Sequence, residues 1–385
     1  MATSTPKPLR LADARHIQDF TFIDLFAGIG GTRLAFDAAG GKCIFTSEWD
    51  VKAQETYKRN YGEDHLSGDI TSVVAESVPD HDVLVAGFPC QPFSLAGVSK
   101  KNSLGRSHGF LDEAQGTLFF DIIRILKEKK PSAFFLENVK NILSHDKGNT
   151  FRVIEGSLRE LGYSFQWMIV DASHYVPQNR QRVYMVGYLT GTGMGTPTFT
   201  FPDYPANPKP TVRSILERKV DPKYTLTDNL WVYLQGYAAK HAAAGNGFGY
   251  GLVDPKGQTR TLSARYHKDG AEILIPQNNK NPRRLTPREC ARLQGFPENF
   301  IIAVADSSAY KQFGNSVAVP AVRAVAESMR TYILAMRKHR KLFPAQDPKY
   351  AQRQIGDTVP ERGQVSGITG PLRTKHQQQK VTERA

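Results

Sequence analysis

The chain of 385 residues is long enough for one large domain and a smaller one. It carries 50 lysines and arginines against 37 acidic residues, and the resulting charge of +13 predicts a polyanionic partner, most simply nucleic acid. Three widely spaced cysteines, Cys43, Cys90 and Cys290, indicate neither a zinc site nor a disulfide framework, which favours the cytoplasm. The apolar runs are too short to span a bilayer, and residues 1–10 lack the apolar core of a signal peptide.

A glycine-rich turn between two predicted strands follows a polar arm over residues 1–18. The sequence predicts a strand over 21–26, the turn over 27–31, a helix that ends at Gly40 and a second strand over 43–47. This is a βαβ unit of the kind that binds nucleotides. A nicotinamide-binding turn would read G-x-G-x-x-G, but Arg33 stands at the last glycine position, which argues against a close approach to a pyrophosphate.

Glu48 and Trp49 follow the second strand, where a nucleoside would lie. An acidic residue about 20 residues after the glycine turn can bind ribose hydroxyl groups. The indole of Trp49 can stack on an adenine or can simply pack in the core, and the sequence leaves both open. Asp69 can likewise accept an adenine amino group or cap the next turn. A nucleoside cofactor without a pyrophosphate, such as S-adenosylmethionine, fits these residues better than NAD.

Cys90 lies in a loop between two prolines, directly after a predicted strand. The apolar residues 82–87 predict a buried strand, and Pro89 and Pro92 on either side of the cysteine end regular structure there. Ligands of open α/β sheets bind at the carboxyl ends of strands, so Cys90 is a candidate nucleophile, with a buried structural cysteine as the alternative. The basic segment that follows, 95–116, is long for a connection and predicts a mobile functional loop.

A carboxylate and two arginines are expected near this loop. Glu137 ends the buried strand predicted over 132–136, so it projects to the rim where Cys90 lies, unless it forms a salt bridge with a loop. Arg180 and Arg182 alternate just before an apolar strand and therefore point to one side. Two guanidinium groups there suit a phosphate or a base carbonyl, and a solvated strand end is the alternative.

The composition changes at Thr190. Residues 190–283 are rich in Gly, Pro, Asn and aromatic residues and have few helix signals, which predicts a second, smaller domain of mostly β or irregular structure. Within it, 245–251 is a glycine–aromatic stretch and 259–270 mixes cations, hydroxyl groups and a tyrosine. Arg, Asn, Ser and Thr side chains are the ones that read base edges, so this domain is a candidate for target recognition.

Helical patterns return after this domain. The sequence predicts a helix over 287–294 that is capped by Thr286, and a stretch over 311–317 that enters a long helix reaching about Arg340. Cys290 falls inside the first of these helices and is expected in the core. The last segment, 341–385, is polar and rich in Gln, Pro and Arg, so we expect a disordered basic tail.

Five motifs in chain order carry a resemblance to a known family. They are Phe-Ala-Gly-Ile-Gly-Gly at 26–31, Pro-Cys-Gln at 89–91, Glu-Asn-Val at 137–139, Gln-Asn-Arg-Gln-Arg at 178–182 and Gly-Asn-Ser at 314–316. Over roughly residues 20–335 the chain resembles the cytosine-C5 DNA methyltransferases, and five ordered motifs are far more specific than one. Three further stretches are similar to the Dcm-type branch: 94–106, 245–252 and 260–274.

Members of that branch methylate the inner cytosine of CCWGG, or of CCNGG in some cases. The chain departs from the namesake of the branch, because it lacks the long N-terminal extension, is more compact over residues 140–185, and has a tail without a counterpart. The resemblance therefore leaves the exact target open between CCWGG and CCNGG.

The resemblance implies a doubly wound, Rossmann-like α/β methyltransferase sheet with a smaller, mostly β or irregular target-recognition domain. The implied division is a catalytic and cofactor-binding domain at 19–189, the recognition domain at 190–283 and a C-terminal part of the catalytic domain at 284–340. The expected cofactor is S-adenosylmethionine, the expected partner is double-stranded DNA, and no metal is expected. We expect a monomer in the bacterial cytoplasm, with or without a cognate restriction endonuclease for the same site.

The resemblance also assigns roles to residues. In this family a thiolate adds to C6 of a flipped-out cytosine, and C5 then attacks a methyl sulfonium. Cys90 would be the nucleophile, and Glu137, held partly protonated by burial, would act at N3. Arg180 and Arg182 would stabilise the developing charge, with Arg182 nearer O2. The residues expected to bind the cofactor are Phe26, Gly28, Ile29, Gly30, Gly31, Glu48, Trp49, Asp69, Ile70, Phe88, Leu118, Asn315 and Ser316. Those expected to contact DNA are Gln91, Ser94, Lys100, Lys101, Arg106, Asn246, Arg260, Arg265 and Tyr266, of which Asn246 would fill the space left by the flipped base.

Two other functions remain open from the sequence alone. One is an RNA (tRNA) cytosine-5 methyltransferase of the same fold, although such enzymes have a smaller second domain without a stretch like 245–251. The other is a catalytically idle DNA-binding module. An idle module would be expected to lose Cys90, Glu137 or Arg182, and all three are present.

Overall fold

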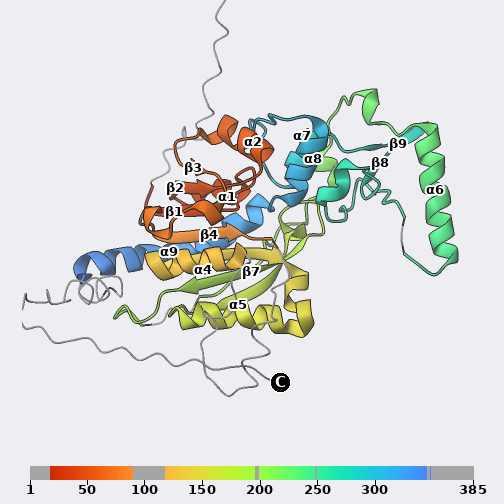
Figure 1. Cartoon of the computed structure of the whole chain (residues 1–385). Helices are drawn as coiled ribbons and strands as arrows, with labels where there is room; N and C mark the ends of the chain where they lie inside the picture. Colours follow the sequence, from red (N-terminus) through yellow and green to blue (C-terminus); the bar gives the residue numbers. More distant parts are fainter. Residues whose placement is uncertain (1–17, 90–117, 196–198, 248, 345–346, 348–385) are drawn as a thin grey trace, which may run out of the picture.

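A computed structural model describes residues 18–89, 118–195, 199–247, 249–344 and 347 of the chain. Seven strands form one sheet in the order β3-β2-β1-β4-β5-β7-β6, and helices cover it (Figure 1). This mixed α/β architecture with a large, mostly parallel sheet is the one that the sequence predicted. A separate two-stranded sheet, β8-β9, lies in the region expected to recognise the target.

The elements have the following bounds. The strands are β1 (Phe20–Leu25), β2 (Gly41–Ser47), β3 (Leu66–Ser67), β4 (Val83–Gly87), β5 (Ala133–Val139), β6 (Gln166–Asp171), β7 (Gln181–Tyr188), β8 (Leu274–Gln277) and β9 (Lys280–Arg284). The helices are α1 (Gly31–Ala38), α2 (Val51–Tyr61), α4 (Leu118–Lys129), α5 (Asn149–Glu160), α6 (Asp228–Ala243), α7 (Pro287–Leu293), α8 (Asp306–Asn315) and α9 (Val319–Leu342). None of the helices in these ranges has the length and the apolar character that crossing a membrane requires.

The side chains of β1, an inner strand of the sheet, alternate between two cores. Phe20 and Phe22 join the cluster that contains α1 and α9, and Ile23 and Leu25 join the cluster that contains α4 and α5. Each buried side chain of this size stabilises the fold by roughly 1.5–3 kcal/mol relative to an exposed one. Burial on both faces explains why the strands read as continuous apolar runs in the sequence.

β7 runs antiparallel to both of its neighbours, β5 and β6, whereas β1 to β5 pair in parallel. The start of β7 therefore lies at the edge of the sheet where β5 ends. The register places Arg182 opposite Val139, and Tyr184 opposite Glu137. Because of this reversal, residues that precede β7 reach the same rim as residues that follow the parallel strands.

The stretch over 311–317, which was predicted to enter a long helix, ends one helix before the long helix begins. α8 ends at Asn315 and α9 begins at Val319, with extended backbone at Ser316. Pro320 lies in the first turn of α9, where its missing N–H costs nothing, and a proline inside one continuous helix would have removed a hydrogen bond. The break presents a turn to the rim of the sheet.

The region between β7 and α7 contains a helix that the sequence analysis did not expect. α6 spans 16 residues and is preceded by the N-cap Thr227, whose side chain accepts a hydrogen bond from the backbone N–H of Leu230. Leu234 is its buried residue, so α6 lacks the amphipathic period that marks a core-facing helix. Figure 1 shows α6 at the edge of the molecule, beyond β8 and β9 and away from the seven-stranded sheet.

Candidate active site

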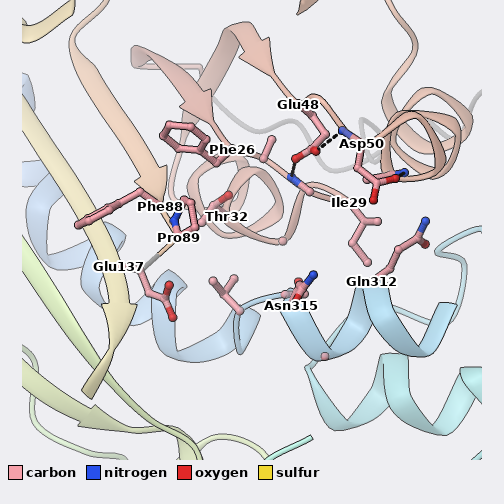
Figure 2. Close-up of a pocket in the computed structure, with 18 of the residues that line it drawn as sticks. Phe26, Ile29, Thr32, Glu48, Asp50, Phe88, Pro89, Glu137, Gln312 and Asn315 are labelled. Atoms are coloured by element: carbon pink, nitrogen blue, oxygen red, sulfur yellow. Dashed lines mark hydrogen bonds between the residues drawn. The ribbon is translucent and has the colours of Figure 1, made fainter. Parts of the chain in front are cut away.

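A cavity of about 430 Å³ opens at the carboxyl ends of β1, β2, β4 and β5. Figure 2 shows Phe88, Pro89 and Glu137 on one side of it and Glu48 and Asp50 on the other. A second cavity of about 240 Å³ adjoins it and shares five of its lining residues, which are Phe26, Glu48, Trp49, Pro89 and Leu118. Ligands of open α/β sheets bind at this edge, so the two cavities mark the candidate site.

The glycine turn between β1 and α1 forms one wall. Gly28 has a φ of +56°, and Gly30 has a φ of +81°. At Gly30 an added Cβ would lie 2.4 Å from the ring of Tyr61, whose hydroxyl donates to the Gly30 carbonyl. Gly30 is thus required by the close approach of Tyr61, and in the described structure it does not line either cavity, unlike Gly28, Ile29 and Gly31.

Glu48 holds this turn from the end of β2. Its Oε2 accepts a hydrogen bond from the Gly28 N–H at 2.7 Å, and its Oε1 accepts one from the Asp50 N–H at 2.7 Å. Burial raises the pKa of the Glu48 carboxyl, and the two N–H donors oppose that rise. Each carboxylate oxygen has a second lone pair, so Glu48 can still accept hydrogen bonds from the hydroxyl groups of a ligand.

The structure places Trp49 and Asp69, for each of which the sequence left two roles open. The indole of Trp49 is 69% exposed, so packing in the core does not explain it, and it lines both cavities. Asp69 caps a short turn, because its Oδ1 accepts a hydrogen bond from the Thr71 N–H at 3.0 Å. It lines the smaller cavity together with the buried Ile70, and stacking or hydrogen bonding to an adenine stays a prediction for both Trp49 and Asp69.

Glu137 and Arg182 form an ion pair at the opposite wall. Arg182 Nε lies 3.1 Å from Glu137 Oε1, and both side chains line the larger cavity. An added Cβ on Gly87 would lie 3.6 Å from Glu137 Oε2, so the carboxylate lies next to the residue where β4 leads toward Cys90. The pair comes from the end of β5 and the start of β7, which the antiparallel register brings together.

The predicted nucleophile, Cys90, lies outside the described residues. So do five predicted DNA contacts, which are Gln91, Ser94, Lys100, Lys101 and Arg106. The two residues before the cysteine are described: Phe88 is buried in the core, and Pro89 lines both cavities. The amide of Asn138 donates a hydrogen bond to the Phe88 carbonyl at 2.9 Å. The sequence did not single out Asn138. Because successive side chains of a strand point to opposite faces, Asn138 points away from Glu137 and toward Phe88.

Arg180 requires a correction to its predicted role. Its side chain is 2% exposed, and its guanidinium donates to the backbone carbonyls of Leu262, Gly314 and Ser316 at 3.0, 3.3 and 2.5 Å. Burial lowers the pKa of Arg180 to about 9, and the neighbouring Arg182 adds to this effect. A guanidinium with three backbone partners holds chain segments together, although Arg180 also lines the larger cavity, and stabilisation of the base by Arg182 stays a prediction.

The predicted DNA-reading residues of the second region fall into two groups. Asn246, Arg260 and Arg265 are exposed. Tyr266 is fully buried: its hydroxyl donates to the Ile273 carbonyl and accepts from the Leu285 N–H. The prediction that Tyr266 contacts DNA is therefore wrong, because the short helical turn Ala264–His267 directs its side chain inward, between the exposed side chains of Arg265 and His267.

The break between α8 and α9 brings further residues to the cavity. Asn315 and Ser316 line it as the motif suggested, and so do Phe26, Phe88 and Leu118 from other elements. Thr32, Asp50, Lys311, Gln312 and Val317 are among the lining residues that were not assigned to the site from the sequence. Lys311 Nζ lies 3.1 Å from Asp50 Oδ2, which joins α8 to the start of α2 at the rim of the cavity.

Residues 20–358 match the model of the C-5 cytosine-specific DNA methylases. The chain belongs to this family. It is a DNA (cytosine-5-)-methyltransferase, which decides between the functions that the sequence left open. The chain is 47% identical over 390 residues to the DNA-cytosine methyltransferase of Escherichia coli (strain K12), an alignment that covers 86% of this chain and 81% of that protein. It is 54% identical over 313 residues to the Type II methyltransferase M.SsoII of Shigella sonnei, with 80% of each chain covered.

The fold of the methyltransferase also has a solved counterpart. The crystal structure of the Schizosaccharomyces pombe (S. pombe) Dnmt2 methyltransferase superimposes with a TM-score of 0.63 and covers 81% of this chain and 99% of that one. The two sequences are 20% identical, so this likeness supports the fold alone.

Proposed function

We propose that this methyltransferase uses S-adenosylmethionine to methylate the inner cytosine of CCWGG, or of CCNGG, in double-stranded DNA. The observation that carries the proposal is that one cavity joins a nucleoside-type site, at Glu48 and Trp49, to the pair Glu137–Arg182. The methyl donor and the base would thus meet at one rim of the sheet. The target sequence rests on the resemblance of 94–106, 245–252 and 260–274 to the Dcm-type branch.

The residues of the two cavities suit S-adenosylmethionine. Glu48 offers acceptors for ribose hydroxyl groups, and the exposed face of Trp49 is free to stack on a purine. Gly28 places backbone against the ligand without a side chain, and Asn315 closes the cavity from α8. When bound, S-adenosylmethionine would supply an electrophilic methyl group. Phe26, Leu118 and Ile70 would provide the apolar walls around it.

The chain would supply the remaining chemistry. The Cys90 thiolate adds to C6 of the cytosine, which forms a C–S bond and makes C5 nucleophilic. Glu137 hydrogen-bonds or protonates N3, and Arg182 stabilises the charge that develops toward O2. After C5 has been methylated, loss of the C5 proton and elimination of the thiolate restore the aromatic ring. A thiolate cannot reach C6 inside a stacked duplex, so the base is flipped out.

The proposal also covers the setting of the reaction. The recognition domain over 190–283 would read the site through exposed residues such as Arg260 and Arg265, and Asn246 would fill the space left by the base. The catalytic parts would be 19–189 and 284–340. The enzyme would act as a monomer in the bacterial cytoplasm, in a Dcm-like role or beside a restriction endonuclease for the same site.

Bisulfite sequencing of plasmid DNA tests the proposal. The plasmid is taken from cells that express the chain or its Cys90→Ala variant. We expect protection of the inner cytosine at CCWGG with the intact chain and loss of that protection with the variant. Protection at every CCNGG selects the second target. Protection at an unrelated sequence overturns the proposed target, and protection by Cys90→Ala overturns the nucleophile.

A further inference from the structure

Two buried side chains hold the backbone of a single residue in the recognition region. Gln178 Oε1 accepts a hydrogen bond from the Leu262 N–H at 2.8 Å, and Arg180 donates one to the Leu262 carbonyl at 3.0 Å. Gln178 is fully buried, and it alternates with Arg180 and Arg182 along the chain. Gln178 and Arg180 therefore bind the segment 259–263 through Leu262, and Arg182 forms the ion pair with Glu137.

The same two side chains also hold the catalytic part of the molecule. The Gln178 amide donates to the Leu293 carbonyl at 3.2 Å and to Gln294 Oε1 at 3.3 Å. Gln294 in turn donates to the Phe313 carbonyl at 2.7 Å, close to the end of α8. The guanidinium of Arg180 donates to the carbonyls of Gly314 and Ser316, on either side of Asn315.

The recognition segment 259–263 and the turn 314–316 also touch directly. An added Cβ on Gly314 would lie 2.4 Å from the carbonyl carbon of Ser263 and 2.5 Å from the backbone nitrogen of Ala264. The two backbones therefore pack so closely that no side chain fits between them at Gly314, and this packing restricts their relative movement. On its other side the segment exposes Arg260, which is a candidate DNA contact.

We propose that Gln178 and Arg180 are positioning residues that couple the recognition segment 259–263 to the cofactor turn 314–316. DNA bound at the exposed side of the segment would fix the segment, and through Arg180 it would fix the turn that closes the cofactor cavity. Binding of DNA and binding of cofactor would then strengthen each other by the same factor, as linkage requires. The inference rests on the proposed function, because it takes Asn315 and Ser316 as cofactor contacts.

Titration calorimetry on the full chain tests the coupling. S-adenosylhomocysteine is titrated with and without a duplex that carries one CCWGG site, and the ratio of the two Kd values is the readout. We expect the duplex to tighten binding about tenfold in the unchanged chain. In Arg180→Lys and Gln178→Met we expect the ratio of the two Kd values to fall below about threefold, whatever the change in the Kd without DNA. Arg159→Lys on the exposed face of α5 is the matched control and should keep the full ratio.

Several results would overturn the inference. One is an unchanged ratio in both variants, which would show that the two side chains support the fold only. Another is a ratio of one in the unchanged chain. If both variants fail to fold, as judged by thermal unfolding, the side chains are structural and the coupling is rejected. Failure of the unchanged chain to bind S-adenosylhomocysteine at all would instead overturn the proposed cofactor. The bisulfite experiment tests DNA methylation separately, so the two failures can be told apart.

Discussion

Two arginine–glutamate pairs in the molecule are built in different ways. In Arg283–Glu289, two guanidinium nitrogens reach the two carboxylate oxygens at 2.7 and 2.8 Å, and the backbone N–H groups of Glu217 and Thr286 donate to the same oxygens. In Glu137–Arg182, the described contact is one approach of 3.1 Å between Nε and Oε1. The first pair is 0–7% exposed, and the second, at 11–16%, borders the cavity.

The difference separates a structural pair from a chemical one. A buried carboxylate whose lone pairs all have donors contributes to holding β9 and α7 in place, and it has no capacity left for a ligand. A carboxylate with one partner and a cavity in front of it can still bond to a substrate. The sequence does not show the number of donors around each carboxylate, and that number carries the distinction.

Glu137→Gln should have the largest effect on activity. The amide keeps the shape of the side chain but removes the acid, so we expect methyl transfer to fall by about 10²–10⁴-fold. Single-turnover transfer from labelled S-adenosylmethionine to a CCWGG duplex measures this. The unfolding midpoint should stay close to that of the unchanged chain. Near-normal transfer by this variant would remove Glu137 from the chemistry.

Glu289→Gln should have the opposite pattern. It leaves Arg283 buried beside a neutral amide, and breaking a buried pair in this way costs about 3–5 kcal/mol of unfolding free energy. Urea unfolding measures that loss. The specific activity of the folded fraction should remain within a factor of a few of the unchanged chain. A loss of activity without a loss of stability would show that Arg283–Glu289 takes part in the reaction, and the two pairs would then not differ in role.

Asp24→Asn tests a third buried carboxyl, on β1. Its Oδ2 accepts a hydrogen bond from the hydroxyl of Thr32, and burial raises its pKa to about 7. Between pH 4 and pH 7 the folded chain keeps this proton while the unfolded chain has lost it, so stability falls as the pH rises through that window. The variant lacks this titration, and its stability relative to the unchanged chain should rise by about 2–3 kcal/mol between pH 5 and pH 8. If the unfolding free energies of the two proteins change with pH in parallel, the raised pKa of Asp24 is contradicted.

The sequence predicted the parts of the site that local patterns determine. Apolar runs located the strands, and the glycine turn and Glu48 followed from their positions at strand ends. The placement of Glu137 at the rim needed only the end of a buried strand. The direction of β7 was not predictable, because an apolar strand buried on both faces reads alike in parallel and antiparallel pairing.

Other features depended on contacts between distant segments. Arg180 looked like a ligand for a phosphate or a base, and only the fold reveals carbonyl partners 82–136 positions away in the chain. Tyr266 lies between Arg265 and His267, which are exposed, so its burial depends on the turn that contains it. The sequence did not predict α6, because an exposed helix with one buried residue lacks the apolar periodicity of an amphipathic helix.

The contacts that join the recognition segment 259–263 to the catalytic core have an evolutionary consequence. Gln178 and Arg180 bind the N–H and the carbonyl of Leu262, and Gly314 abuts the backbone of Ser263 and Ala264. Every amino acid except proline has both of these backbone groups. Side chains on the exposed side of this segment, which we propose to contact DNA, can therefore be exchanged while these backbone contacts are kept. A protein built in this way can acquire a new target sequence by substitution along one short segment while its chemistry is inherited unchanged.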